Sequence, residues 1–346
     1  MKRDSIRLEQ IADRENLLRA TWKAAQGKQH RPAVARFLHD LEGRLNQLAN
    51  AILQEHAPLG RCRRFVIHDP KRREITAACF ADRVLHHAIM NLAEPRFERM
   101  LVESSFACRP GKGVHAAIIA VQNNLRRYPW LVQVDIQSYF LAIDHAILNK
   151  LLATRFKGTA FLHLLERIIA VGDSSSSGCG LPIGSLTSQH FANAYLDSAD
   201  RFLLNHSAVC AHVRYMDDIV WWCRSRQAAT ETLNCLRDFL WQSRKLTVKS
   251  TVQIRQSRQG LCFCGFRVRQ GVVLPSSRKL SRYRAGLKRI NTARVNAAVS
   301  EQQAQRACDN LIATLNGTQS LRFRQRLLAN DDTAMDLYTS DSGCRS

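Results

Sequence analysis

The tetrapeptide Tyr215-Met216-Asp217-Asp218 places two adjacent carboxylates between two short apolar runs, 209–213 and 219–222. This pattern predicts a β-hairpin with both acids at its bend. Two carboxylates at a tight turn form a ready ligand pair for a hard divalent cation. Aspartate is also a common turn former, so an isolated pair would equally suit a solvated turn. Whether these acids do chemistry therefore depends on the residues that accompany them.

A third acid, Asp135, ends the apolar segment 130–134, which predicts a buried strand. If this strand neighbours the hairpin in one sheet, three carboxylates converge and repel one another unless cations lie between them. Two Mg²⁺ ions about 3.5–4 Å apart are the usual means of in-line phosphoryl transfer, and Mn²⁺ is the alternative metal. One ion would activate a 3′-hydroxyl, and the other would stabilise a leaving pyrophosphate.

The chain is strongly basic. Among its 346 residues, 51 are Lys or Arg and 29 are Asp or Glu, which gives a formal net charge of +22. The segment 239–300 contains 14 Lys or Arg and no Asp or Glu. Such a balance predicts a surface that binds a polyanion. Nucleic acid is the leading candidate, and an anionic membrane surface is the second.

The sequence favours a cytoplasmic protein. It has no run of about 18 apolar residues, so no membrane-spanning helix is expected. The N-terminus lacks the apolar core of a signal peptide. Eleven cysteines are scattered without a paired framework, which favours reduced thiols.

Among the helices expected outside the acidic segments, one is long and amphipathic and another is strongly basic. Apolar residues recur at three- and four-residue steps from Val34 to Leu53, which predicts one long amphipathic helix. Near the C-terminus, a second predicted helix carries six cations that would follow a nucleic-acid backbone through salt-sensitive contacts. These are Arg278, Lys279, Arg282, Arg284, Lys288 and Arg289.

Several other sequence motifs occur before and after the acidic tetrapeptide in a defined order along the chain. Downstream of Asp135 they are 135–145, with the sequence Asp-Ile-Gln-Ser-Tyr-Phe at its start, then 180–189, 215–218 and 260–266. Upstream they are 70–75, 82–88 and 106–113. Together they resemble the motifs of reverse transcriptases, and the resemblance covers roughly residues 60–270.

The resemblance implies an α+β fold, a right-handed polymerase with fingers, palm and helical thumb. Its palm would be an antiparallel sheet flanked by helices. The expected division is an N-terminal helical extension (1–59), fingers (60–125), a palm with interleaved fingers elements (126–270), a basic thumb (271–330) and a polar tail (331–346). No room is left after residue 330 for a nuclease domain, which favours a minimal enzyme that relies on partners. The implied ligands are template RNA, a primer and dNTPs.

The resemblance also assigns the site. Asp135, Asp217 and Asp218 would be the catalytic metal ligands, with the backbone carbonyl of Ile136 as an extra ligand. Phe140 would lie under the sugar and reject a 2′-hydroxyl, although a phenylalanine of the core would need no such role.

The remaining assignments concern the nucleotide. Lys71, Arg73 and Arg109 would bind the triphosphate, where arginine forks match phosphate oxygens; a contact to the RNA backbone is the competing interpretation, above all for Lys71. Gly184 would let the backbone approach the nascent base pair, while Ile183, Gln189 and Tyr215 complete the substrate-binding set. Lys249 would either donate a proton to pyrophosphate or bind phosphate backbone.

The segment Ile183-Gly184-x-x-x-Ser188-Gln189 differs from the Gln-Gly-x-x-x-Ser-Pro of most reverse transcriptases. It resembles the enzymes of diversity-generating retroelements, which copy a template RNA inaccurately at adenines and are accompanied by a small basic accessory protein. Two basic proteins would repel each other unless RNA bridges them or acidic patches exist on this chain. The alternatives are a retron-like, intron-derived or phage-defence reverse transcriptase, and an inactive RNA-binding protein.

Overall fold

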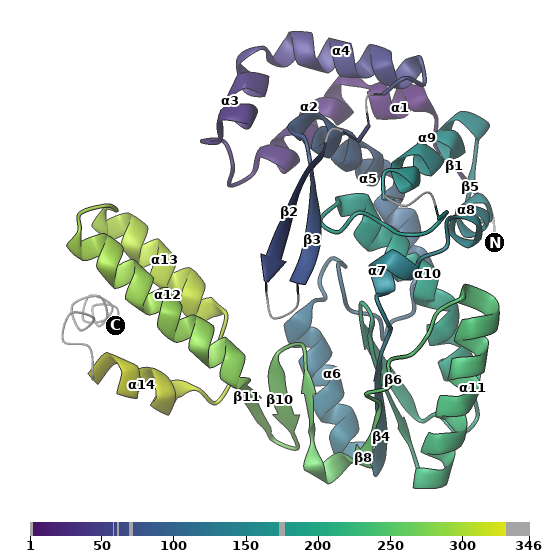
Figure 1. Ribbon diagram of the computed structural model, residues 1–346, viewed down its shortest axis with the longest axis vertical. Helices are drawn as coiled ribbons and strands as arrows, with labels where there is room; N and C mark the ends of the chain where they lie inside the picture. Colours follow the sequence, from purple (N-terminus) through teal and green to yellow (C-terminus); the bar gives the residue numbers. More distant parts are fainter. Residues whose placement is uncertain (1–2, 58, 61, 69–71, 173–176, 330–346) are drawn as a thin grey trace, which may run out of the picture.

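The computed structural model describes residues 3–57, 59–60, 62–68, 72–172 and 177–329. The chain begins with a short strand, β1, and four helices that form a layer of their own at the top of Figure 1. Their bounds are β1 (Asp4–Ser5), α1 (Leu8–Ala12), α2 (Arg14–Ala25), α3 (Pro32–His39) and α4 (Leu41–Leu53). The polar tail predicted at 331–346 lies outside the described residues.

The single helix expected from Val34 to Leu53 is wrong, because the helix is broken at Asp40 into α3 and α4. Asp40 has φ −113° and ψ 47°, and its carboxylate folds over Gly43, where a β-carbon would lie 2.4 Å from Oδ1. A short polar side chain that competes with the backbone, together with a glycine, therefore ends one helix and allows another to start. Periodicity alone does not reveal such a break.

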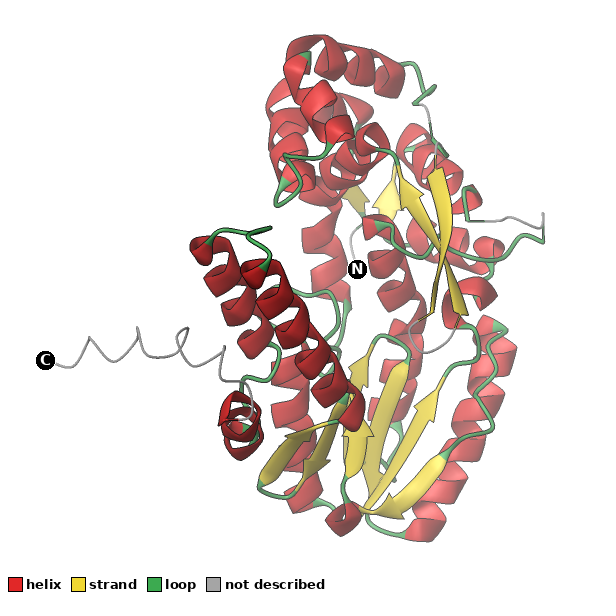
Figure 2. Ribbon diagram, turned by 60° about the vertical axis from the view of Figure 1, so that its left-hand side comes forward, coloured by secondary structure: helices red, strands yellow, loops and turns green. Residues whose placement is uncertain are grey.

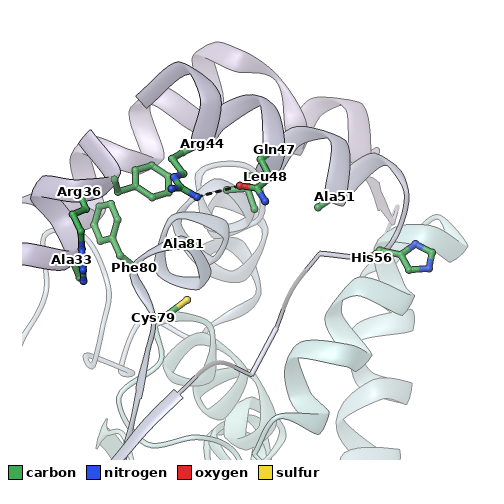
Figure 3. A pocket seen from close by; sticks show the side chains of 11 residues that line it. Ala33, Arg36, Arg44, Gln47, Leu48, Ala51, His56, Cys79, Phe80 and Ala81 are labelled. Atoms are coloured by element: carbon green, nitrogen blue, oxygen red, sulfur yellow. Dashed lines mark hydrogen bonds between the residues drawn. The ribbon is translucent and has the colours of Figure 1, made fainter. Parts of the chain in front are cut away.

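A hollow of about 680 Å³ lies between α3, α4 and the start of α5 (Figure 3). Phe37 and Phe80 meet edge to face there, with ring centroids 4.9 Å apart. Arg44 donates a hydrogen bond of 3.4 Å to Gln47 at the rim. The hollow belongs to the N-terminal layer, and none of the three acids predicted to be catalytic lines it.

Below this layer, the antiparallel hairpin of β2 (Cys62–His68) and β3 (Arg72–Ala78) reaches toward the rest of the molecule (Figure 1). It lies within the range expected for the fingers, 60–125, and is termed here the fingers hairpin. Two helices follow, α5 (Phe80–Met100) and α6 (Val114–Arg127). Further along the chain come α7 (Tyr139–Ala142), α8 (His145–Ala153), β5 (Phe156–Lys157) and α9 (Thr159–Ala170).

The centre of the fold is a four-stranded antiparallel sheet, the palm sheet, with strand order β6-β7-β4-β8. Its strands are β4 (Trp130–Asp135), β6 (Ala211–Tyr215), β7 (Asp218–Cys223) and β8 (Gln253–Gln256). Neighbouring residues of a strand point to opposite faces, so Trp221 packs in one core and Trp222 in another. The helices α10 (Leu186–Asn205) and α11 (Arg226–Arg244) cover the first face, and α6 covers the second. The expected antiparallel sheet flanked by helices is confirmed.

The chain then forms a small sheet and three helices, the thumb helices, which stand apart from the palm sheet (Figure 2). The elements are the 3₁₀ turn η1 (Ser257–Gln259), β9 (Leu261–Phe263), β10 (Phe266–Arg269), β11 (Val272–Pro275), α12 (Ser277–Val295), α13 (Glu301–Ala313) and α14 (Leu321–Ala329). The expected basic helix is α12. The thumb helices bury a core of their own around Tyr283 and Leu287.

Two contacts fasten the thumb helices to the small sheet. The Lys279 ammonium lies 3.7 Å from the centroid of the Phe266 ring, which is a cation–π contact. In the connection between α13 and α14, the amide of Gln319 donates to the carbonyl of Val273 in β11 over 2.9 Å. No helix in the described part of the chain is long and apolar enough to cross a membrane.

Candidate active site

Strand pairing brings the three predicted acids together. In the register of β4 with β7, Asp135 lies directly opposite Asp218. The turn between β6 and β7 holds Met216 and Asp217, and Met216 has a left-handed φ of 57°. The predicted hairpin is therefore confirmed, with Asp217 in its turn and Asp218 as the first residue of β7, and so is the adjacency of the strand that ends at Asp135.

The three carboxylates repel one another at this edge. Burial, and then the charge of Asp135, raise the pKa of Asp217 to about 6. Burial raises the pKa of Asp218 to about 7, although Gln133 Nε2 donates a 2.9 Å hydrogen bond to its Oδ1. The site thus holds more negative charge than its protein surroundings stabilise.

Lys249 supplies the neighbouring positive charge. Its ammonium forms an ion pair with Asp135 Oδ2, and its amide donates to the Asp135 carbonyl over 2.9 Å. The other oxygen, Asp135 Oδ1, is buried without a hydrogen-bond partner in the described structure. Lys249 therefore lies at the carboxylates, as either of its two predicted roles requires.

The residues present suit a hard divalent cation. Carboxylates are the oxygen ligands that Mg²⁺ and Mn²⁺ prefer, and Asp135 Oδ1 is an acceptor that the protein leaves unused. In the described ranges, no three Asp, Glu, His or Cys side chains are already gathered around one point. Asp135, Asp217 and Asp218 are the residues that would hold such a cation, which would supply positive charge at the place where Lys249 now supplies it.

The backbone of Ile136 faces the same side as Asp217. The Asp135 carbonyl accepts from Lys249, and the Gln137 amide donates to Thr247 over 2.9 Å, so both groups point toward the 247–249 segment. Because backbone groups alternate along an extended strand, the carbonyl of Ile136 points the other way, to the side of β4 on which β7 lies. This orientation is the one that a metal-ligating carbonyl needs.

The segment 180–184, termed here the 180–184 wall, connects α7 with β3. The amide of Leu181 donates to the carbonyl of Phe140 in α7 over 2.8 Å, and the amide of Thr76 in β3 donates to the carbonyl of Ile183 over 3.1 Å. Gly184 has φ +108°, and a β-carbon there would lie 3.4 Å from Ile75 Cγ2. The structure thus joins the fingers hairpin, Ile183, Gly184 and the half-buried Phe140 into one surface.

A sequence model of the family "Reverse transcriptase (RNA-dependent DNA polymerase)" matches residues 68–268, which is more than half of the chain. The chain belongs to the reverse transcriptase family. Its residues 135–140, 180–189 and 215–218, on which the resemblance was based, all lie within the matched range.

Several curated proteins are similar to this reverse transcriptase. An uncharacterised 91 kDa protein in the cob intron of Schizosaccharomyces pombe is 27% identical over 139 residues, 39% of this chain and 17% of that protein. Protein YkfC of Escherichia coli is 27% identical over 177 residues, 47% of this chain and 44% of that protein. The group II intron-encoded protein LtrA of Lactococcus lactis is 26% identical over 139 residues, 39% of this chain and 23% of LtrA.

The matches to these three relatives span less than half of each relative's length. Among solved structures, telomerase from Candida tropicalis in complex with a fragment of telomeric RNA matches with a TM-score of 0.49 and 10% identity. That match covers 85% of this chain and 62% of the telomerase chain.

Arg109, which was predicted to bind the triphosphate, contacts other parts of the protein in this structure. Its guanidinium is buried and donates twice to Glu98, at 2.6 and 2.9 Å, and to the carbonyls of Val102 and Ser105. All of its donating nitrogens are thereby used inside the protein, where an arginine without its acid would be costly. In this structure Arg109 therefore stabilises the 102–109 loop, and binding of the triphosphate by Arg109 stays a prediction.

The other predicted residues divide into two groups. Lys71 lies outside the described residues, as does the side chain of Arg73, whose backbone pairs with Ile67 in the fingers hairpin. Gln189 accepts a 3.3 Å hydrogen bond from Cys108, which brings the 105–110 loop against α10. Tyr215 is half-buried against the core that α6 covers, and burial raises its pKa.

Sequence reasoning missed the buried support of the acidic turn. Arg214 is fully buried and donates to Asp200 on α10 over 2.7 Å, to Asn193 Oδ1 over 3.0 Å and to the carbonyl of Met216 over 3.0 Å. The turn that carries Asp217 is thereby tied to the helix behind it. The available signal was that His212 and Arg214 alternate with apolar residues on one face of a strand, and a buried charge requires a partner.

Proposed function

We propose that this chain is an RNA-directed DNA polymerase that copies an RNA template into cDNA. The observation that supports this most strongly is the convergence of Asp135, Asp217 and Asp218 at one sheet edge in a chain of the reverse transcriptase family. Extension of a DNA primer on an RNA template with dNTPs and Mg²⁺ tests it directly. In this proposal, residues 1–59, 60–125, 126–270 and 271–330 act as extension, fingers, palm and thumb.

The carboxylates and the Ile136 carbonyl would hold two Mg²⁺ ions, which supply activation of the 3′-hydroxyl and charge stabilisation at the pyrophosphate. Release of Lys249 from Asp135 would then free its ammonium beside the reacting phosphates. There it either donates a proton to pyrophosphate or binds phosphate backbone. The pH–rate profile of Lys249→Ala separates these roles, because only the loss of a proton donor changes the shape of the profile.

We expect Phe140→Ala to weaken the discrimination between dNTPs and rNTPs. Phe140 is the aromatic residue that is hydrogen-bonded through its backbone to the 180–184 wall, five positions after Asp135. Removing its ring leaves room for a 2′-hydroxyl, and we expect discrimination to fall on the order of tenfold or more. Single-nucleotide incorporation of dCTP and CTP gives the ratio. Phe140→Tyr, which keeps the ring, is the control, and an unchanged ratio in Phe140→Ala would rule out the gate.

We further propose that the enzyme makes errors at template adenines, as in a diversity-generating retroelement. Ile183 replaces a glutamine of most reverse transcriptases, and an apolar side chain beside the nascent pair cannot donate a hydrogen bond to it. Base-pair geometry would then be checked less strictly. The proposal includes a small basic accessory protein as a partner.

Ile183→Gln therefore has a specific expected effect. Misincorporation opposite template adenine should fall on the order of tenfold, which corresponds to about one net hydrogen bond. Ile183→Val keeps the apolar character and serves as the matched control. Deep sequencing of cDNA from an adenine-rich RNA gives the error spectrum. If both variants err at adenines as the wild type does, Ile183 does not set fidelity.

An intron-derived role is the alternative that the relatives favour, because two of them are named as intron proteins. The same polymerase would then copy its RNA template accurately. Sequencing of cDNA made from the adjoining genomic RNA distinguishes the two roles. Errors confined to adenines support the retroelement, and a uniformly low error rate supports the intron-derived enzyme.

A further inference from the structure

The end of the palm sheet opposite the carboxylates carries a dense group of arginines. There β4 begins at Trp130, which pairs with Cys223 at the end of β7 and with Gln256 at the end of β8. Six residues of strand span about 17–20 Å, so this end lies about that far from Asp135. Five exposed arginines, termed here the basal patch, are Arg126, Arg127, Arg224, Arg226 and Arg258.

Three distant chain segments build the basal patch. Arg126 and Arg127 end α6, Arg224 and Arg226 connect β7 to α11, and Arg258 lies in η1. The amide of Ser257 donates to the carbonyl of Pro129 over 2.8 Å, which fixes η1 beside the end of α6. The lower ends of α6, β4 and β8 also meet in Figure 1. The positive charges are thus gathered by the fold and not by one run of sequence.

The basal patch contains no neutralising acids. None of its five arginines forms an ion pair within the described part of the chain. The segments that build it, 104–134, 219–230 and 239–300, contain no Asp or Glu at all. The first acid of α11 is Glu231, which accepts from Gln227. Two arginines are common at a helix C-terminus, but five unpaired ones from three segments suit a bound polyanion.

A pocket of about 330 Å³ opens within the basal patch. Half-buried Tyr128 and Trp130 line it, together with the apolar Leu125 and Pro129 and the amide of Gln256. Arg126, Arg127 and Arg258 stand at the same pocket. Aromatic rings that can stack on an unpaired base, next to arginines that can hold phosphates, are the combination by which proteins bind single-stranded RNA.

We propose that the basal patch is a second RNA-binding site, which takes a single-stranded or looped segment of RNA. An unpaired base enters the pocket beside Tyr128, and the flanking phosphates contact Arg127 and Arg258. The role of this site rests on the proposed function: it would hold the template RNA by a segment that is not being copied. A double helix would leave the pocket unused, since its bases are paired.

The test separates this site from the catalytic cleft. The cleft of the full chain is first saturated with a short RNA–DNA primer–template hybrid, and a fluorescein-labelled 20-nucleotide single-stranded RNA is then titrated. We expect Arg127→Glu/Arg258→Glu to weaken binding of this probe on the order of tenfold or more, and to lower its salt dependence. Primer extension on the short hybrid should stay within about twofold of wild type, because neither arginine belongs to the catalytic site.

Two further variants sharpen the result. Arg19→Glu/Arg237→Glu makes the same charge change at exposed arginines of α2 and α11 outside the basal patch, and it should keep wild-type affinity. Tyr128→Ala should weaken binding while leaving the salt dependence unchanged, because stacking involves no counterion. Ultraviolet crosslinking of a 4-thiouridine probe should mark a peptide that contains Tyr128 and Trp130.

Unchanged affinity in Arg127→Glu/Arg258→Glu, with no crosslink at this peptide, would overturn the proposal. The proposal would also be overturned if Arg127→Glu/Arg258→Glu bound RNA like wild type but no longer bound a partner protein, because the basal patch would then be a protein-docking surface. A wild-type chain that crosslinks at Tyr128 but extends no primer would keep the RNA site and refute the proposed polymerase. The two proposals therefore fail by different outcomes.

Discussion

We expect Asp217→Asn to reduce RNA-templated dNTP incorporation by about three orders of magnitude or more, because a lost metal ligand removes several kcal/mol of charge stabilisation. Asp217 stands at the bend of the β6–β7 turn, beside the pair formed by Asp135 and Asp218. Steady-state primer extension with saturating Mg²⁺ measures the loss. Asp238→Asn makes the same change at an exposed position of α11 and should leave activity unchanged.

The same substitution should stabilise the metal-free protein at alkaline pH. The pKa of Asp217 is raised from 3.8 to about 6 in the folded chain, so its stabilising contribution is complete below about pH 4 and is lost as pH rises through 6. Asparagine resembles the protonated acid at every pH. In EDTA, the melting temperature of the variant should exceed that of wild type by a few degrees at pH 8, and the difference should vanish near pH 4.

Together these measurements separate catalysis from folding. An inactive variant that is also destabilised would indicate damage to the fold and not loss of a ligand. Incorporation that survived Asp217→Asn and Asp217→Ala would refute the polymerase proposal and favour an inactive RNA-binding protein.

Arg214→Met should be the most destabilising of these single changes. Its partner Asp200 is fully buried, and loss of the guanidinium leaves a buried carboxylate without its main counter-charge. Breaking such a pair costs about 3–5 kcal/mol. Urea unfolding gives the loss. Arg14→Met removes an exposed ion pair with Glu42, and it should leave the urea unfolding midpoint nearly unchanged.

A double variant tests whether Arg214 also positions the turn. Arg214→Met/Asp200→Leu removes both buried charges, so much of the lost stability should return. The carbonyl of Met216 still lacks the donor that held it at 3.0 Å, and kcat should therefore stay reduced on the order of tenfold or more while KM for dNTP changes little. Full recovery of kcat together with stability would show that Arg214 serves folding alone.

The site was predictable from sequence where its geometry is local. A two-residue turn between short strands fixes the positions of Asp217 and Asp218 through chain connectivity. An apolar strand that ends in Asp135 is expected to be buried, and pairing with this hairpin in one sheet is the simplest way to bury it. The family match adds to this local reasoning the order in which the segments occur.

Non-local partners could not be predicted in the same way. Arg109 looks like a phosphate ligand beside Pro110 and Gly111, yet Glu98, on the preceding helix, holds its guanidinium inside the protein. Arg214 depends on Asn193 and Asp200, which reach it only because α10 packs behind β6. The break at Asp40 depends on the space over Gly43. Each of these choices is made by a contact between separate elements, which residue periodicity does not encode.

The attachment of α12 to the small sheet gives the thumb the geometry of a lever. Lys279 fixes the near end of α12 to Phe266, and the 19 residues of α12 extend about 28 Å from that end. A rotation of about 10° at the near end moves the far end by about 5 Å. The near end hardly moves, and it adjoins Cys264 and Gly265, next to the acidic turn. In the proposed polymerase, such a rotation would release a duplex along most of its length and leave its growing end in place.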